Sequence, residues 1–230
     1  MDQTISLRIE GIYDIRTAQF LRGEGITHFS FDFRPKSFNF LQQYRFLEIM
    51  DSALYLGQTY FLHYENEKDF VVAKMLNDFA SLAKGSVNLK DQLLLEFSDV
   101  REVEYYESFG MPFFWHYQLC RGREEILRSP KLKGVVFSDT FLEDAIRLKE
   151  WASIVQTCRQ NGVQVVVSGA WDFSFKFSQK LYPEKILDID MLSLPIDNSV
   201  EVCYRNVDLY KLRDGMSALP KEVFTTTHIS

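Results

Sequence analysis

The sequence has few cysteines, no excess of basic residues and no long apolar run, and each shortage excludes a class of protein. Cysteines stand only at positions 120, 158 and 203, without a CxxC pair. An odd, widely spaced set argues against a disulfide framework or a zinc knuckle and is typical of a reducing compartment. The first residues, MDQTISLRIEG, lack the basic and apolar segments of a signal peptide, and no transmembrane run follows. We therefore expect a cytoplasmic protein with no membrane partner.

Positive charge is also scarce, because 26 Lys and Arg face 32 Asp and Glu, which gives a formal net charge of −6. This balance argues against general affinity for nucleic acid. No Pro-, Gly- or Ser-rich linker divides the chain, so residues 1–230 are expected to form one domain. Aromatic residues, in contrast, make up 15% of the chain. Many should be core, and several near strand ends could narrow a pocket.

Strand-like and helix-like segments alternate along the chain. The first strand ends at Glu10, and the second leads into the loop at 35–37 after one amphipathic helix. Apolar runs predict further strands at 59–64, 92–97, 113–119, 134–138, 163–168 and 186–194. Helical spacing or turn signals mark 40–54, 67–83, 100–109, 121–129, 141–161, 173–181 and a helix from Asp208.

Eight strands alternating with helices over this length predict a single (β/α)8 TIM barrel. An open doubly wound sheet is the rival, but the near-even spacing of the units favours closure. Function in such barrels lies at the C-terminal ends of the strands. That rule selects Glu10, Asp32, His63, Glu65, Glu96, Gln118, Asp139, Ser168 and the loop near Asp197.

Two of these carboxylates, Glu10 and Asp139, could form an acid/base pair across the barrel mouth. A carboxylate desolvated by aromatic rings can have its pKa raised toward neutrality and serve as a general base. The alternative is that Glu10 is solvated or paired with a nearby Lys or Arg.

A second group of polar residues suggests a metal site: His63, Glu65, Glu96 and His116. Neighbouring residues of a strand face opposite sides of the sheet, so few of these side chains are expected to point inward together. A rim of ordinary polar residues is the simpler interpretation. We therefore predict no metal and no cofactor.

Several motifs resemble those of the phosphoribosylanthranilate isomerase family. Residues 8–12, RIEGI, are similar to the family's K-I-C-G-I opening, and residues 31–37, FDFRPKS, to its F-V-F-A-P-K-S. At matching spacing, Val200-Glu201 resembles its V-E pair, and Asp208 with Lys211 its K-D-x-x-K-I helix start. The resemblance implies a TIM barrel of tryptophan biosynthesis that isomerises an aminoaldose phosphate with a Cys base and an Asp acid.

The sequence departs from this family where the chemistry would lie. The resemblance places the acid at Asp139, but Glu10 replaces the base Cys, and Asn39 replaces an Arg that meets the substrate carboxylate. The loops that would hold phosphate have lost glycines, which limits close approach of backbone N–H groups. The binding positions implied by the resemblance are Lys36, Asn39, Ser168, Gly169, Asn198 and Ser199.

These departures favour a diverged barrel, or pseudoenzyme, with a binding or regulatory role. Its partner would be a small molecule at the C-terminal mouth or another protein. The alternative is a sugar-phosphate isomerase of the Amadori type that uses Glu10 as base and Asp139 as acid.

Overall fold

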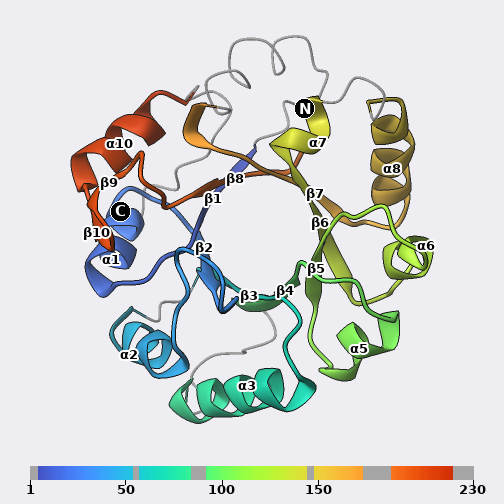
Figure 1. The fold of residues 1–230 in the computed structure, drawn as a ribbon, viewed down its shortest axis with the longest axis horizontal. Coiled ribbons are helices and arrows are strands. Elements are labelled where there is room, and N and C mark those ends of the chain that lie inside the picture. The colour runs from blue at the N-terminus through green and yellow to red at the C-terminus, as the bar shows by residue number, and fades with distance from the viewer. Residues whose placement is uncertain (1–4, 54–56, 84–91, 144–147, 173–187, 220–230) are drawn as a thin grey trace.

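The computed structural model describes residues 5–53, 57–83, 92–143, 148–172 and 188–219. Eight parallel strands close into a barrel in sequence order (Figure 1). This confirms the predicted (β/α)8 fold. The strands are β1 (Ser6–Glu10), β2 (His28–Asp32), β3 (Thr59–Tyr64), β4 (Leu93–Phe97), β5 (Phe113–His116), β6 (Leu132–Ser138), β7 (Gln164–Ser168) and β8 (Met191–Pro195).

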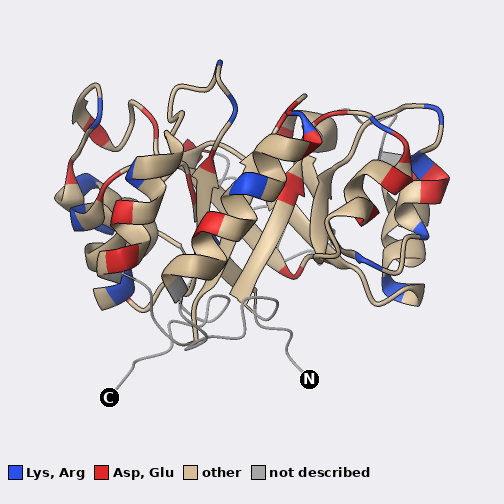
Figure 2. Ribbon diagram, turned by 90° about the horizontal axis from the view of Figure 1, so that it is seen from below, with Lys and Arg blue, Asp and Glu red and all other residues tan. Residues whose placement is uncertain are grey.

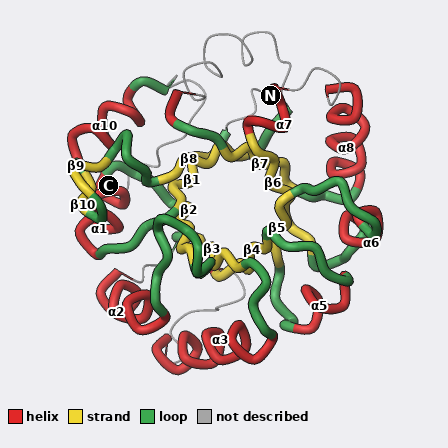
Figure 3. Tube along the Cα trace, viewed as in Figure 1, coloured by secondary structure: helices red, strands yellow, loops and turns green. Residues whose placement is uncertain are grey.

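Helices surround the barrel as an outer ring (Figure 3). They are α1 (Ile15–Gly23), α2 (Gln43–Ala53), α3 (Asp69–Ala83), α5 (Val103–Ser108), α6 (Arg123–Leu127), α7 (Asp139–Glu143), α8 (Leu148–Gln160) and α10 (Leu209–Ser217). Figure 2 shows the Lys, Arg, Asp and Glu positions mainly on these helices and on the loops, while the strands carry few. The charged residues thus lie mostly outside the strand layer.

Local sequence explains why the first and last helices begin where they do. Asp14 precedes α1, and its carboxylate accepts a hydrogen bond from the Thr17 backbone N–H at 2.8 Å. Asp208 precedes α10 and accepts from the backbone N–H groups of Tyr210 and Lys211. Such caps satisfy N–H groups that have no partner inside the helix.

The structure differs from the sequence prediction in a few elements. The helical pattern at 141–161 corresponds to two helices, α7 and α8, and residues 144–147 between them are outside the described ranges. The helix expected at 173–181 and the start of the strand expected at 186–194 also lie outside those ranges. A small antiparallel hairpin of β9 (Glu201–Cys203) and β10 (Asn206–Val207) was not predicted.

Two apolar cores lie on the two sides of the strand layer. The larger packs the outward faces of the strands against the helices. The smaller fills the barrel interior and consists of Phe61, Phe114, Val136, Val166 and Met191. Side chains therefore fill the interior of the barrel at the height of these five residues, as expected for a barrel of eight strands.

A polar side chain follows each of these interior apolar residues two positions later in the same strand. Alternation directs residues i and i+2 to the same face, so the later residue also points into the barrel, nearer its C-terminal end. The interior thus changes from apolar to polar along the barrel axis. The polar members of these pairs are His63, His116, Ser138, Ser168 and Ser193.

Candidate functional site

Arg8 is the centre of the polar layer inside the barrel. It is fully buried, and its Nε donates to Ser193 Oγ at 2.6 Å. Its terminal nitrogens donate to Glu10 Oε1 at 2.6 Å and to the two Glu96 oxygens at 2.9 and 3.1 Å. The guanidinium carbon lies 4.8 Å from the centre of the Phe61 ring. One side chain of β1 thus joins β4 and β8 through charge-assisted hydrogen bonds.

The two carboxylates around Arg8 are held in the charged form. Burial by itself raises the pKa of Glu10, but the Arg8 charge and the Ser193 hydroxyl outweigh it, so the pKa lies below its usual range. Burial also raises the pKa of Glu96, yet Arg8, followed by His63 and His116, holds that pKa far below normal. Glu10 therefore lacks the raised pKa that a carboxylate base needs near neutral pH.

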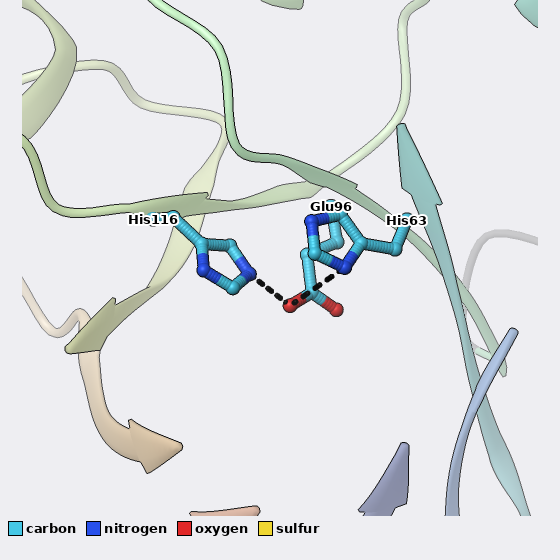
Figure 4. Close-up of side chains that lie close together, drawn as sticks. All are labelled: His63, Glu96 and His116. Atoms are coloured by element: carbon cyan, nitrogen blue, oxygen red, sulfur yellow. Dashed lines mark hydrogen bonds and ion pairs between the residues drawn. The ribbon is translucent and has the colours of Figure 1, made fainter. Parts of the chain in front are cut away.

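His63, Glu96 and His116 converge at the ends of three neighbouring strands (Figure 4). His116 Nε2 lies 2.5 Å from Glu96 Oε1, and His63 Nδ1 lies 4.0 Å from the same oxygen. The two imidazole rings are stacked, with centres 4.5 Å apart. One ligand atom from each of the three residues lies within 4.8 Å of the other two.

From the sequence, few of the four polar residues at these strand ends were expected to point inward together. This prediction is wrong, because three of the four do so. Each of the three is the inward residue at the end of a different strand, so alternation within one strand does not separate them. Glu65 is exposed beyond the end of β3 and is not part of the cluster.

A pocket of about 370 Å³ opens at the C-terminal ends of β1, β2 and β8. Asp32 at its wall binds Arg34 through two guanidinium hydrogen bonds of 2.9 and 2.6 Å and accepts another from Ser37. The pocket is lined by Glu10, Gly11, Asp32, Arg34, Ser37, Phe38, Asn39, Pro195, Ile196, Asp197 and Asn198. Glu10 thus belongs both to the Arg8 network and to this pocket.

A larger groove of about 660 Å³ lies on the outside of the barrel against α1 and α2. Its lining includes Arg16, Tyr44, Glu48 and Arg205, and none of the strand-end residues. Functional groups of (β/α)8 barrels gather at the strand ends, so the smaller pocket is the better candidate site.

Glu10 and Asp139, the predicted catalytic pair, have separate partners. Asp139 is the first residue of α7, and its carboxylate accepts from the backbone N–H of Thr140 at 2.7 Å and of Ala170 at 3.3 Å. Glu10 is bonded to Arg8 and Ser193. Pairing of Glu10 with an Arg was the alternative left open from sequence, and the structure shows it.

Asn39 lies buried at the floor of the mouth pocket. Its Nδ2 donates to the Ile196 carbonyl oxygen at 2.5 Å and so ties the loop after β2 to the end of β8. A Cβ built on Gly11 would lie 2.2 Å from that Nδ2, and Gly11 has a positive φ of 75°. Only glycine fits beside the Asn39 amide here.

The other five predicted binding residues lie at different places around the mouth. Asn198 lines the pocket, and Ser168 ends β7. Lys36 is exposed on the loop after β2 and is not among the pocket residues. The backbone N–H of Gly169 donates to the Ser193 carbonyl at 3.1 Å, and that of Ser199 donates to Asp197 Oδ1 at 2.9 Å.

Arg8, Ser193 and Arg34 were not proposed as site residues from the sequence. For Arg8 a signal was present, because a charged residue two positions before Glu10 in the same strand must share its face. For Ser193 the corresponding signal is its position two residues after Met191 on β8. Arg34 gave none, because the contacts of a loop residue depend on the fold of the whole mouth.

His28, the first residue of β2, makes stability depend on pH. Its register partner on β1 is Arg8, so its side chain faces the barrel interior. Burial there, followed by the Arg8 charge, lowers the pKa of His28 from 6.5 to about 4. The unfolded chain therefore binds more protons between pH 6.5 and 4, and stability falls as pH falls through that window. We expect a loss of about 2–3 kcal/mol from this group by pH 4.5.

The measurement is urea unfolding of wild type and His28→Gln at pH 7.0 and 4.5. The variant should lose less stability than wild type between these two values, because it lacks the titrating ring. Equal losses in the two proteins would show that His28 does not cause the acid sensitivity.

The fold and the mouth define a TIM-barrel protein whose interior is polar at the C-terminal ends of its strands. Among solved structures it is similar to phosphoribosylanthranilate isomerase. The isomerase of Thermotoga maritima has 14% identity and a TM-score of 0.65, over 94% of this chain and 98% of that one. The Thermus thermophilus enzyme has 16% identity and a TM-score of 0.64, over 93% of this chain and 98% of that one. TrpF of Jonesia denitrificans has 10% identity and a TM-score of 0.63, over 94% of this chain and 96% of that one.

This likeness confirms a phosphoribosylanthranilate isomerase-like fold over most of the chain, as the sequence motifs implied. Neither protein-family models nor curated proteins gave a match. Across the ranges that the structure describes, none of the helices is both long and apolar enough to cross a membrane.

Proposed function

We propose that this protein is a phosphoribosylanthranilate isomerase-like barrel that binds a small, unphosphorylated polar molecule at its mouth and does not catalyse the isomerase reaction. The observation that carries this proposal is that the chain's own carboxylates occupy backbone N–H groups of the loops after β7 and β8. Asp139 accepts from the N–H of Ala170, and Asp197 from the N–H of Ser199. In a phosphate site, such N–H groups face the ligand.

The charges of the mouth also oppose a phosphorylated ligand. Among the described residues that line the pocket, the carboxylates of Glu10, Asp32 and Asp197 stand against one guanidinium, that of Arg34, and Glu10 is bonded to the buried Arg8. Arg34 is already paired with Asp32 at 2.6 Å. A phosphate 4 Å from one unpaired carboxylate would meet a repulsion of about 1 kcal/mol in water and several times more in a drier pocket. The pocket therefore suits a neutral or cationic molecule.

A solved phosphoribosylanthranilate isomerase complex gives the contrast. That protein holds reduced 1-(o-carboxyphenylamino)-1-deoxyribulose 5-phosphate, a ligand with both a carboxylate and a phosphate. In the present chain Asn39 stands at the position matched to the carboxylate-binding Arg, and it is buried against Gly11 and Ile196. An amide cannot replace the charge or the bidentate geometry of a guanidinium.

The isomerase reading is the second candidate, and one observation favours it. Glu10 is partly exposed, lines the pocket and lies at the position of the base. Against it stand the lowered pKa of Glu10 and its bonds to Arg8 and Ser193.

Complementation of a tryptophan auxotroph that lacks the isomerase separates the two candidates. We expect no growth from this chain, with an authentic isomerase as the positive control and soluble expression checked in the same strain. Growth that is lost in both Glu10→Gln and Asp139→Asn would overturn the proposal and establish the isomerase.

Binding is tested by thermal shift with a panel of neutral polyols, amines and sugar phosphates. Hits should be unphosphorylated, and Asn198→Trp, which fills the pocket from its exposed rim, should abolish them. Glu48→Trp, which fills the outer groove, is the matched control and should leave them unchanged. Hits confined to sugar phosphates, or lost only in Glu48→Trp, would contradict the proposal.

The proposed compartment is the cytoplasm.

A further inference from the structure

We propose that His63, Glu96 and His116 form a binding site for a divalent transition-metal ion of the Zn²⁺ type. The inference does not depend on the function proposed above, because the cluster is formed by β3, β4 and β5 and none of its residues lines the mouth pocket. It stands on four observations: convergence of the ligand atoms, a buried imidazole that no described hydrogen bond holds, the charge of the surroundings and the donor set.

The ligand atoms are already close to the spacing that a metal needs. Bonds of about 2.0–2.2 Å to a tetrahedral ion place its ligand atoms roughly 3.4 Å apart. The three atoms here lie within 4.8 Å of one another, and two of the pairs are separated by 2.5 and 4.0 Å. Small side-chain rotations would bring them to bonding distance without movement of the strands. Figure 4 shows both rings directed toward the Glu96 carboxylate.

His63 supplies the second observation. Its side chain is 3% exposed, and its Nε2 has no hydrogen-bond partner in the part of the chain that the structure describes. Its Nδ1 lies 4.0 Å from Glu96, beyond hydrogen-bond distance. An imidazole buried without partners is costly, and such a group in a native fold calls for an explanation such as an ion. The nitrogen nearer the carboxylate, Nδ1, would be the metal ligand, and coordination there would fix a buried ring that no described hydrogen bond holds.

The charges around the cluster leave room for one cation. Within the described ranges, Arg8 is the one Lys or Arg side chain bonded to the two carboxylates Glu10 and Glu96. The nearby Asp32 and Arg34 neutralise each other. One negative charge of the two carboxylates therefore remains, and a bound metal ion would balance it.

Two imidazole nitrogens and one carboxylate oxygen are a donor set suited to Zn²⁺ and neighbouring transition metals, and ill-suited to Mg²⁺ or Ca²⁺. Three protein ligands would leave a coordination position open, as in catalytic sites. Arg8 donates to both Glu96 oxygens, to Oε2 at 2.9 Å and to Oε1 at 3.1 Å, and Oε1 also faces the histidines, so the guanidinium would orient the ligating carboxylate. His116, which is 22% exposed, is the open side of the cluster.

The experiment uses full-length protein stripped with a chelator and then titrated with Co²⁺, followed by visible absorption and by competition with Zn²⁺. We expect one equivalent of Co²⁺ with ligand-field bands that Zn²⁺ abolishes. His116→Gln should weaken binding at least about 100-fold, because losing a ligand costs more than losing an outer contact. Glu96→Gln is the second test, with folding of both variants checked by circular dichroism.

Two matched controls assign the signal. His28→Gln removes a histidine that faces the same interior outside the cluster and should bind normally. Cys203→Ser removes an exposed free thiol that could hold Co²⁺ adventitiously, and it should also bind normally. No stoichiometric binding by wild type, or binding that survives His116→Gln and is lost in Cys203→Ser, would overturn the proposal. Growth of the auxotroph bears only on the isomerase question and leaves this test unaffected.

Discussion

Arg8→Met should lower the free energy of unfolding by about 3–5 kcal/mol, a large part of the stability of a domain. The substitution keeps most of the side-chain volume but removes the guanidinium that is bonded to both Glu10 and Glu96. Glu96 is fully buried, so its charge would be left without compensation. Breaking one side of such a pair is far more costly than the pair itself is stabilising, because the remaining charge stays desolvated. Urea unfolding at pH 7 measures the loss.

The control removes the partners as well. The triple variant Arg8→Met, Glu10→Gln, Glu96→Gln should recover most of the lost stability, because no buried charge remains unpaired. Arg45→Met breaks an exposed pair with Glu48 and should cause no measurable change. If Arg8→Met alone is as stable as wild type, the buried network does not hold the barrel together.

Gly134→Ala should lower the free energy of unfolding by about 1–3 kcal/mol. Gly134 is the register partner of Phe114 on the neighbouring strand, so both face the barrel interior. A Cβ built on Gly134 would lie 2.0 Å from the Phe114 ring, which is packed at 5.0 Å against the Phe61 ring. The ring cannot move aside without disturbing the interior core. Urea unfolding again measures the effect.

A double-mutant cycle with Phe114→Leu tests that cause. The smaller side chain relieves the clash, so the loss in the double variant should be smaller than the sum of the two single losses by about 0.5–3 kcal/mol. Gly23→Ala, on α1, is the matched control, because a Cβ there meets nothing within 4 Å. It should be neutral or slightly stabilising. Additive losses in the cycle would contradict the steric explanation.

The barrel could be predicted because its signals are local. Buried apolar runs gave β3 at 59–64 with its observed bounds and placed β4 within one residue. The division of 141–161 into α7 and α8 was missed, because apolar spacing continues through both helices. The hairpin of β9 and β10 gave no signal, since strands of three and two residues are too short for a periodic pattern.

The site was predicted only in part, because its partners lie far apart in the sequence. The position of Glu10 at a strand end followed from local pattern, and Arg8 lies two residues earlier in the same strand, but the partner Ser193 follows only from closure of the barrel, which pairs β1 with β8. The convergence of His63, Glu96 and His116 likewise depends on the relative register of three strands. Alternation along one strand says which face a residue takes, and it does not say which residues of other strands meet it.

The Arg8 network also penalises errors in strand register. A slip of β1 by one residue would turn every side chain of the strand to its opposite face. Arg8 would then enter the apolar layer beneath the helices, where Ile9 now packs, and Glu10 would lose its guanidinium partner. A strand made only of aliphatic residues would tolerate that slip at small cost. The charged interior thus discriminates between the native closure of the barrel and its nearest misfolded alternatives, whatever ligand the mouth accepts.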